Sequence, residues 1–529
     1  MPGPLRVWQQ RALELLAHWR EGPFLLSAAP GAGKTRPALE LARSELAAGA
    51  IDAVVVACPT APLTRQWAAA AAGLGVELAP DAESPRPPRG FHGVAITYAR
   101  IAGAPVRWGR TLPRRTLVIA DEAHHLGEEL AWGDSFAKAF AAAPRWLLLS
   151  GTPFRSDATP IPGVRYDASG LAEPDFSYAY ADAVGDAICR PVSFVAYDGT
   201  LSWRSGHDVI ESSFETVLTG REAGRRYRTA ISTELPDGLP RILREADAKL
   251  RAVRAAGHSD AGGLVIAADS AHARRVAALL REATGRAPLV VLHTEARAAA
   301  KLAAFTCSRD PWIVAVNMVS EGVDIPRLRV GVYATAAKTA LVFRQIVGRF
   351  VRTLPGRPVE PSWLYVPADP ILREHASSVE TELRHVLARR EPDDEGWDRP
   401  ERRASERAQT PEFVPLSADV APQLTLFGEA RALAPGAVAS PPAPAAPAAG
   451  PRSGVGGGWH DAPAFERRAL LRGERHRLVA EVRRRDGTSH REINSWLNRR
   501  VGITRVEDAT IEELEHSVEL LVRKLTGRR

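Results

Sequence analysis

A recurring pattern of short, unbroken apolar runs constrains this chain most. Each run is followed by a polar or glycine-rich turn and then by a stretch with helical spacing. Continuous rather than alternating apolarity predicts strands buried on both faces, and hence parallel sheets flanked by helices. The pattern breaks between about residues 155 and 235, so we expect two α/β domains joined by a connecting segment. The runs are 24–26, 54–57, 94–96, 117–120, 146–149, 264–267, 290–292, 313–316 and 330–333.

The 529 residues predict three or four compact units. From Ala434 to Gly458, 22 of 25 residues are Ala, Pro, Gly or Ser, a composition that cannot bury a core. After this linker, capping-box patterns at Ser489 and Thr510 open two helices, with Gly502 as a stop between them. We therefore predict a first domain at 1–157, a connecting segment at 158–235, a second domain at 236–390, a linker at 391–460 and a basic helical domain at 461–529.

The composition favours a soluble cytoplasmic protein. The three cysteines lie more than a hundred residues apart and form no CxxC pair, which disfavours a structural zinc site and fits a reducing compartment. The longest apolar run, Trp67 to Val76, is ten residues, well short of the roughly 20 that cross a bilayer. Residues 1–10 show no signal-peptide pattern. The formal net charge of +7 permits a polyanionic partner without demonstrating one.

The strongest motif is the segment Ser-Ala-Ala-Pro-Gly-Ala-Gly-Lys-Thr that ends at Thr35. Such a turn between a strand and a helix directs backbone N–H groups at phosphate. In this pattern Gly31 and Gly33 shape the turn, Lys34 reaches the β and γ phosphates of ATP, and the Thr35 hydroxyl binds Mg²⁺. Ala28 replaces the first glycine of the GxxxxGK[ST] pattern. The simpler alternative is a glycine-rich turn that binds nothing.

Two adjacent carboxylates, Asp121 and Glu122, follow the apolar run 117–120. Carboxylates at the carboxyl end of a buried strand are costly to desolvate unless a cation binds them, and open α/β sheets bind ligands at this edge. We expect Asp121 to hold Mg²⁺ and Glu122 to polarise an attacking water. The alternative is a solvated turn in which both acids begin a helix.

A third motif contains Gln345, Arg349 and Arg352. The two arginines are three residues apart, so on a helix they share a face, with Gln345 on the turn before. Guanidinium groups beside a γ-phosphate stabilise the charge that develops during phosphoryl transfer. In an arginine-rich chain the same spacing also arises by chance.

Taken in order, these segments resemble the superfamily two helicases and translocases of the DEAD/DEAH-box type, especially the branch of type III restriction subunits and RadD-like repair proteins. The resemblance covers about residues 5–370. It implies an α/β fold with two tandem RecA-like parallel-sheet domains, of which the first binds ATP. It also implies that the ATP site is completed only when the two domains close. A disordered linker and a small C-terminal helical domain follow these domains in our prediction.

The same resemblance implies roles for further residues. Gln9 would contact the adenine base, and Gly322 and Asp324 would approach the nucleotide. Other positions match motifs that contact the nucleic-acid backbone without reading bases, or that couple hydrolysis to strand movement. These are Thr60, Arg65, Thr97 and Ser320 for the backbone, and Ser150 and Thr152 for coupling.

Residues 423–427 resemble the pentapeptide by which bacterial repair proteins bind the sliding clamp of DNA polymerase. The matching residues are Gln423, Leu424, Leu426 and Phe427. Leu426 and Phe427 would fill an apolar pocket while Gln423 sets the orientation, as in other short peptide ligands on a flexible tether. The alternative is an apolar stretch that packs on the second domain.

The C-terminal segment is unevenly charged. Residues 467–505 carry twelve Arg and four Asp or Glu, whereas residues 506–522 carry six acids and no Lys or Arg. A helical domain with one basic face suggests additional contact with nucleic acid. A solvated pair of helices is the alternative.

Together these features predict an enzyme, an ATP- and Mg²⁺-dependent DNA helicase or translocase that acts in repair, recombination or replication. DNA is preferred over RNA because of the family resemblance and the clamp-like peptide. Two enzyme alternatives are a DNA-stimulated ATPase that remodels duplex or protein–DNA complexes without separating strands, and an RNA helicase. The non-enzyme alternative is a clamp-associated DNA-binding module.

Overall fold

The computed structural model describes residues 3–128, 130–151, 160–167, 172–205, 207–218, 220–292, 295, 298–316, 325–354, 357, 359–388, 413–423 and 462–526. The chain forms two compact units. The first comprises Met1–Ser27, Lys34–Ser177 and Ala445–Arg529, and the second comprises Ala28–Gly33 and Tyr178–Pro444. No helix among these described stretches is both long and apolar enough to cross a membrane.

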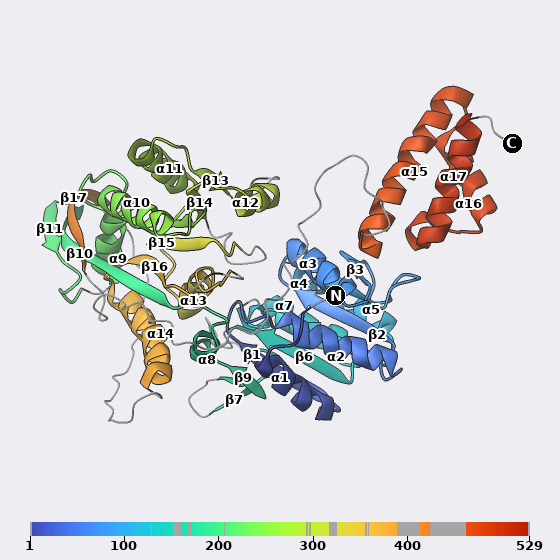
Figure 1. Ribbon diagram of the computed structural model, residues 1–529, viewed down its shortest axis with the longest axis horizontal. Helices are drawn as coiled ribbons and strands as arrows, with labels where there is room; N and C mark the ends of the chain where they lie inside the picture. The colour runs from blue at the N-terminus through green and yellow to red at the C-terminus, as the bar shows by residue number, and fades with distance from the viewer. Residues whose placement is uncertain are drawn as a thin grey trace. The chain divides into compact units, whose positions relative to one another are not determined.

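A seven-stranded sheet forms the core of the first unit, in the order β3-β4-β2-β5-β6-β1-β9 (Figure 1). The pairings of β1 to β6 are all parallel. The central strands are buried along almost their whole length, as continuous apolar runs require. The strands are β1 Gly22–Ala28, β2 Ala53–Cys58, β3 Leu78–Pro80, β4 Gly93–Thr97, β5 Thr116–Ala120, β6 Arg145–Ser150 and β9 Phe176–Tyr178.

Helices alternate with these strands along the chain, as in other parallel sheets. Helix α3 packs against β2, β3 and β4, and α4 packs against β4. A separate pair of short antiparallel strands, β7 Arg165–Tyr166 and β8 Ala172–Glu173, follows β6. The helices are α1 Val7–His18, α2 Thr35–Ala47, α3 Ala61–Ala72, α4 Tyr98–Ala102, α5 Pro105–Thr111, α6 His125–Glu128 and α7 Leu130–Phe140.

The second unit is built on an eight-stranded sheet, in the order β11-β10-β16-β15-β12-β14-β13, with β17 paired to β10. Strands β11 and β17 run antiparallel to β10. The pairings along the rest of the sheet, β10-β16-β15-β12-β14-β13, are all parallel. The strands are β10 Val192–Ser205, β11 Asp208–Ser212, β12 Gly262–Ala267, β13 Leu289–Val291, β14 Trp312–Val316, β15 Leu328–Ala334, β16 Ser362–Pro367 and β17 Phe413–Gln423.

Helices α10 and α11 pack against β12, α10 also against β15 and α11 also against β14. The helices of this unit are α8 Tyr180–Gly185, α9 Gly220–Ala230, α10 Leu239–Ala255, α11 Ser270–Thr284, α12 Ala298–Cys307, α13 Ala340–Val347 and α14 Pro370–Ala388. Eight of the nine apolar runs lie within strands and the ninth, 290–292, passes the end of β13 by one residue, so the prediction of two parallel-sheet α/β domains is confirmed.

The predicted domain boundaries differ from the structure in two places. The connecting segment 158–235 supplies β9 to the first sheet and β10 and β11 to the second. Inside the predicted linker, β17 pairs with β10 over Ala196 to Ser205, so residues 413–423 belong to the second sheet. The pairing is close, since a Cβ placed on Gly199 would collide with the Asp419 carbonyl oxygen. Backbone hydrogen bonding, which composition does not reveal, therefore extends the second domain.

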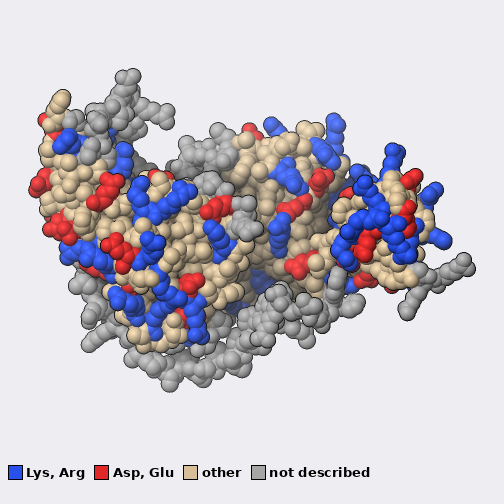
Figure 2. Space-filling view, turned by 90° about the horizontal axis from the view of Figure 1, so that it is seen from above, with Lys and Arg blue, Asp and Glu red and all other residues tan. Residues whose placement is uncertain are grey.

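Three helices and one 3₁₀ turn form the C-terminal region: α15 Ala464–Asp486, α16 His490–Val501, η3 Val506–Asp508 and α17 Ile511–Thr526. The predicted caps are confirmed, because Ser489 opens α16 in a capping box, Gly502 ends it at φ +79°, and Thr510 and Glu513 bond reciprocally at the start of α17. On the face seen in Figure 2, cationic and acidic side chains are interspersed over this region.

Part of the C-terminal arginine content is structural rather than exposed. Arg468 and Arg475 are buried. The Arg468 guanidinium donates to the Ala509 carbonyl oxygen at 2.7 Å, and Arg475 donates to the Asn498 side-chain oxygen at 3.0 Å. These two cations hold the helices together, so they do not contribute to a basic surface.

Candidate functional site

The strands of the first sheet place the motif residues at one edge. Because neighbouring parallel strands end on the same side, the residues that follow them meet there. Ser27 of β1 is in register with Ser150 of β6, and Ala57 of β2 is in register with Ala120 of β5. The predicted residues at or beyond the carboxyl ends of these strands are Lys34, Thr60, Thr97, Asp121, Glu122 and Ser150.

The turn between β1 and α2 has the geometry of a phosphate loop. Gly31 and Gly33 have φ of +87° and +92°, values that side chains on L residues disfavour. Lys34 caps α2 and Thr35 is its first residue. The loop therefore stands at the amino-terminal end of a 13-residue helix, where unsatisfied N–H groups and the helix dipole attract anions.

Lys34 meets the acidic pair across the sheet edge. Its Nζ lies 3.2 Å from Glu122 Oε1, and the Glu122 side chain is 30% exposed. Glu122 also has φ +49°, a left-handed conformation that is uncommon for a residue with a side chain. Such local strain is characteristic of functional positions, because the surrounding structure must hold the residue in place.

Asp121 is held by two aromatic residues to which the motifs assigned no role. Trp67 Nε1 donates to Asp121 Oδ2 at 2.7 Å, and the Tyr98 hydroxyl donates to the Asp121 carbonyl oxygen at 2.7 Å. The other carboxylate oxygen accepts the Glu122 N–H at 3.0 Å. Sequence spacing carries a weak signal for them, since Trp67 follows Thr60 by about two helical turns and Tyr98 directly follows Thr97.

The two carboxyl groups differ in electrostatics. Burial, and then the neighbouring Glu122 charge, raise the pKa of Asp121 above its usual range. Burial also acts to raise the pKa of Glu122, but the Lys34 ammonium and then His124 outweigh it, so the pKa of Glu122 is lowered. Glu122 is therefore ionised at neutral pH, and Asp121 is the group that gains most from a bound cation.

The donor set at this edge fits a magnesium ion. Mg²⁺ in nucleotide sites is held by one or two protein oxygens, with phosphates and waters completing its shell. Asp121 offers a buried carboxylate that is oriented by three hydrogen bonds to the residue, and Thr35 offers a partly exposed hydroxyl. Among the described residues no group of three or more His, Cys, Asp or Glu side chains is arranged to hold a metal ion by itself.

Ser150, a predicted coupling residue, is linked to the acidic pair through a histidine. Its hydroxyl lies 3.0 Å from His124 Nδ1, and the same nitrogen lies 3.6 Å from Glu122 Oε2. Both Ser150 and His124 are buried. Thr152, the second predicted coupling residue, lies outside the described residues.

The predicted nucleic-acid contacts begin two helices. Thr60 caps α3, and its hydroxyl oxygen is buried without a hydrogen-bond partner among the described residues. Thr97 caps α4, where its hydroxyl accepts the Arg100 N–H. Arg65 is exposed and pairs with Asp81 at 3.1 Å, so its guanidinium has an intramolecular partner. Ser320 lies outside the described residues.

The predicted adenine contact, Gln9, lies in the first turn of α1. Its side-chain oxygen accepts the Arg6 backbone N–H at 2.9 Å as part of a capping box, and the residue is buried. Gly322 and Asp324, the predicted nucleotide contacts of the second domain, lie outside the described residues.

The arginine motif is arranged differently from the prediction. Helix α13 contains Gln345 but ends at Val347, so Arg349 lies in the following turn and Arg352 forms a β-bridge with Cys189. The expectation that the two arginines share a helix face is wrong. Gly348, a weak helix former, caps α13, and the Val351 carbonyl accepts the Arg190 N–H at 2.7 Å, which draws this segment into extended backbone.

Within the second unit, Arg352 lies against the phosphate loop. A Cβ placed on Gly31 would be 2.8 Å from Arg352 Nη1 and 2.9 Å from its Cδ. The loop is also held by Cys189, whose thiol donates to the Pro30 carbonyl oxygen at 3.5 Å. Gly31 is therefore required both by its backbone angle and by the space that the arginine occupies.

The clamp-like peptide begins where the second sheet ends. Gln423 is the last residue of β17 and pairs in register with Ala196 of β10. Leu424, Leu426 and Phe427 lie outside the described residues. Clamp binding stays a prediction of the sequence.

The fold and this edge define an α/β protein with two largely parallel sheets and a glycine-bearing turn at the amino terminus of a helix. No protein-family model matches the chain. It is 44% identical over 395 residues to the uncharacterized protein Rv2917 of Mycobacterium tuberculosis, a match that spans 73% of this chain and 65% of the relative. It is 42% identical over 408 residues to the uncharacterized protein ML1624 of Mycobacterium leprae, spanning 75% of this chain and 67% of the relative. The chain belongs to the family of these mycobacterial proteins.

The solved structures that this chain is similar to have low sequence identity to it and TM-scores below 0.5. The ATP-dependent Type ISP restriction-modification enzyme LlaBIII bound to DNA is 16% identical, with a TM-score of 0.48, and the match covers 73% of this chain and 30% of that one. S. cerevisiae Dbp5 bound to RNA and ADP BeF3 is 12% identical, with a TM-score of 0.45, 71% and 87% covered. Mss116p bound to ssRNA and AMP-PNP is 13% identical, with a TM-score of 0.47, 74% and 77% covered.

Proposed function

We propose that this chain hydrolyses ATP when it is bound to nucleic acid and uses that hydrolysis to move along a strand, with DNA as the preferred strand. The contact of 3.2 Å between Lys34 Nζ and Glu122 Oε1 carries this proposal. It joins the phosphate loop to the acidic pair, 88 positions away in sequence, at the sheet edge where α/β proteins bind ligands.

The chemistry follows from an exchange of partners. When the β and γ phosphates enter the loop, Lys34 leaves Glu122 and pairs with them instead. The pKa of Glu122 then rises, because Lys34 is the main group that lowers it. Glu122 thereby becomes a better base for orienting the attacking water and accepting its proton. Thr35 and Asp121 would hold Mg²⁺, which neutralises phosphate charge when it is bound.

An arginine would supply the charge that the transition state needs. Arg352 is the best-supported donor, because its guanidinium lies against Gly31 of the phosphate loop. An arginine that stabilises the γ-phosphate in this way contributes roughly 10³ to 10⁵ in rate. The sequence motif assigns Arg349 and Gln345 to the same task.

Strand binding is assigned to the helices that begin at the same edge. The hydroxyls of Thr60 and Thr97 stand at helix amino termini, which favour phosphate, and such contacts hold a strand without reading its bases. A role in DNA repair, recombination or replication follows from the motif resemblance and the clamp-like peptide. Biochemical assays distinguish this function from two alternatives, which are remodelling without strand separation and action on RNA.

Steady-state ATP hydrolysis tests the proposal, measured with full-length protein alone and with single-stranded DNA, duplex DNA or RNA of equal length. We expect slow hydrolysis alone and stimulation of at least about tenfold by one nucleic acid, with single-stranded DNA strongest. Stimulation by RNA alone would make the chain an RNA-dependent motor. The absence of ATP hydrolysis under all four conditions would contradict the proposal.

A further inference from the structure

We infer that Trp67 and Tyr98 are positioning residues that tie two strand-binding segments to Asp121, the proposed magnesium ligand. The inference rests on the proposed function and deepens it. It names a physical route by which a bound strand alters the nucleotide site of the first unit.

Trp67 connects the first strand-binding segment to the carboxylate. It lies on α3, about two turns beyond the cap residue Thr60. Its indole N–H donates to Asp121 Oδ2 at 2.7 Å, and the residue is only 2% exposed. A buried, charge-assisted hydrogen bond of this kind is short, directional and expensive to lose, so the carboxylate follows the helix. A phosphate that pulls on the amino terminus of α3 therefore acts on Asp121 Oδ2.

Tyr98 makes the second connection, to the backbone of the same residue. It directly follows Thr97 and is the first residue of α4. Its hydroxyl donates to the Asp121 carbonyl oxygen at 2.7 Å, and the residue is 1% exposed. Trp132 and Phe136 pack on its ring, with centroids 5.8 Å and 6.2 Å away, which restricts its movement.

The convergence of both donors on one residue distinguishes this arrangement from ordinary packing. An apolar core position accepts any side chain of suitable volume. Here the indole N–H of Trp67 and the hydroxyl of Tyr98 both donate to Asp121, from the two helices whose amino termini are predicted to bind nucleic acid. Residues that hydrogen-bond a metal ligand typically change metal affinity or activity about 10- to 100-fold when they are removed. Contacts alone do not demonstrate energetic coupling between the strand and the nucleotide. The experiment therefore measures how the strand changes nucleotide affinity.

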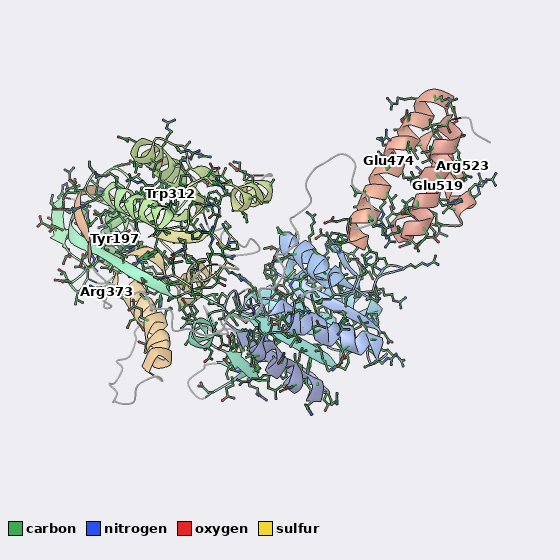
Figure 3. The ribbon with its side chains drawn as sticks, viewed as in Figure 1. Tyr197, Trp312, Arg373, Glu474, Glu519 and Arg523 are labelled. Atoms are coloured by element: carbon green, nitrogen blue, oxygen red, sulfur yellow. The ribbon has the colours of Figure 1, made fainter. Side chains whose placement is uncertain are left out.

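The second unit contains a matched control. Trp312 on β14 donates its indole N–H to Asp247 of α10 at 2.9 Å, and Trp312 is fully buried (Figure 3). The chemistry of this bond is the same as that between Trp67 and Asp121. Neither Trp312 nor Asp247 belongs to a motif of the proposed function.

The experiment measures binding of a fluorescent ADP analogue, mant-ADP, to the full chain. Dissociation constants are measured with and without Mg²⁺, and with and without an oligo-dT strand, for the wild type, Trp67→Phe, Tyr98→Phe and Trp312→Phe. In Trp67→Phe we expect the Mg²⁺-dependent gain in affinity to fall about tenfold, and the effect of oligo-dT on affinity to approach one. Tyr98→Phe should change both ratios in the same direction by less. Trp312→Phe should leave both ratios at the wild-type value and lower only the melting temperature.

Two negative results are distinguishable. If Trp67→Phe and Tyr98→Phe bind with wild-type ratios and differ only in melting temperature, as Trp312→Phe does, both residues serve packing and the inference is overturned while the proposed function stands. If the wild type itself binds no mant-ADP, or binds it without any effect of oligo-dT, the proposed function fails and the inference fails with it.

Discussion

Two lysine–carboxylate pairs, one beside each sheet, have the same chemistry and opposite settings. Lys338 follows β15 and Asp369 follows β16; their Nζ and Oδ2 atoms are 2.6 Å apart, Asp369 is 4% exposed, and Lys338 also lies 3.8 Å from the Tyr227 ring centroid. Lys34 and Glu122 are 3.2 Å apart, with Glu122 30% exposed and in a strained backbone conformation. We call the first pair closed because its carboxylate is buried. We call the second pair open because its carboxylate is partly exposed and can exchange its partner.

The exposure of the carboxylate separates an ion pair that stabilises the fold from one that can take part in turnover. Removing one partner of a buried pair leaves an uncompensated charge and is strongly destabilising. A pair whose carboxylate is partly exposed adds little stability, so stability alone does not account for the pair of Lys34 and Glu122. We therefore expect changes at Lys34 and Glu122 to affect turnover, and changes at Lys338 and Asp369 to affect stability.

The largest effect is expected outside both pairs, at the arginine beside Gly31. Arg352→Ala should lower kcat about 10³-fold, because the guanidinium stabilises the transition state rather than the bound nucleotide. Arg352→Lys should recover little of this loss, since an ammonium lacks the planar fork. Arg281→Ala, at an exposed position of α11, is the control. An equal loss in the control, or a rise in KM with unchanged kcat, would rule out this role.

The open pair is tested next, by Glu122→Gln. We expect kcat to fall about 10²-fold or more while the affinity for mant-ADP is kept, because the base is lost but the phosphate loop is intact. Glu40→Gln on α2, which breaks ion pairs with Arg36 and Arg43, should leave kcat unchanged. Wild-type turnover in Glu122→Gln would show that this residue is not the base.

The closed pair is tested by Asp369→Asn. It should lower the free energy of unfolding by about 3 kcal/mol and the melting temperature by several degrees, since the Lys338 ammonium keeps its burial and loses its counterion. ATP hydrolysis measured well below the melting temperature should change less than threefold. Loss of hydrolysis at an unchanged melting temperature would erase the distinction between the two pairs.

The smallest effect concerns the C-terminal helices. Deleting residues 461–529 should weaken DNA affinity modestly and flatten its dependence on salt, because exposed arginines of α15 and α16 are removed. Arg468 and Arg475 do not enter this estimate, since both are buried in the helix contacts. Fluorescence anisotropy over a series of salt concentrations measures the slope, and an unchanged slope would assign the helices another role.

The sequence predicted those parts of the fold that depend on local pattern. All nine apolar runs became strands, because a strand buried on both faces needs an unbroken apolar run. Strand β17 was missed, since Pro415, Pro422, Ser417 and Asp419 are typical of a linker and only pairing with β10 makes this segment a strand. The end of α13 was missed for a similar reason, because its continuation is decided by the backbone bond between Arg190 and Val351.

The candidate site, like the fold, was predicted from the sequence only where it depends on local motifs. Motif spacing indicated the phosphate loop and the acidic pair, and the structure brings Lys34 to Glu122. No motif indicated Trp67, and Tyr98 belongs to the motif of Thr97 without a role of its own, because the importance of both comes from a hydrogen bond to one distant residue. Contacts between a helix side chain and the residue after a distant strand are not encoded in any local pattern.

Hydrolysis of ATP by Lys34→Ala, beside Lys138→Ala and the wild type, with saturating single-stranded DNA, tests the central claim most directly. Lys138 is exposed on α7 of the same unit and serves as a matched lysine control. We expect stimulated hydrolysis in the wild type and Lys138→Ala. In Lys34→Ala we expect the rate of hydrolysis to fall at least about 100-fold. Normal hydrolysis in Lys34→Ala would contradict the assignment of the phosphate loop.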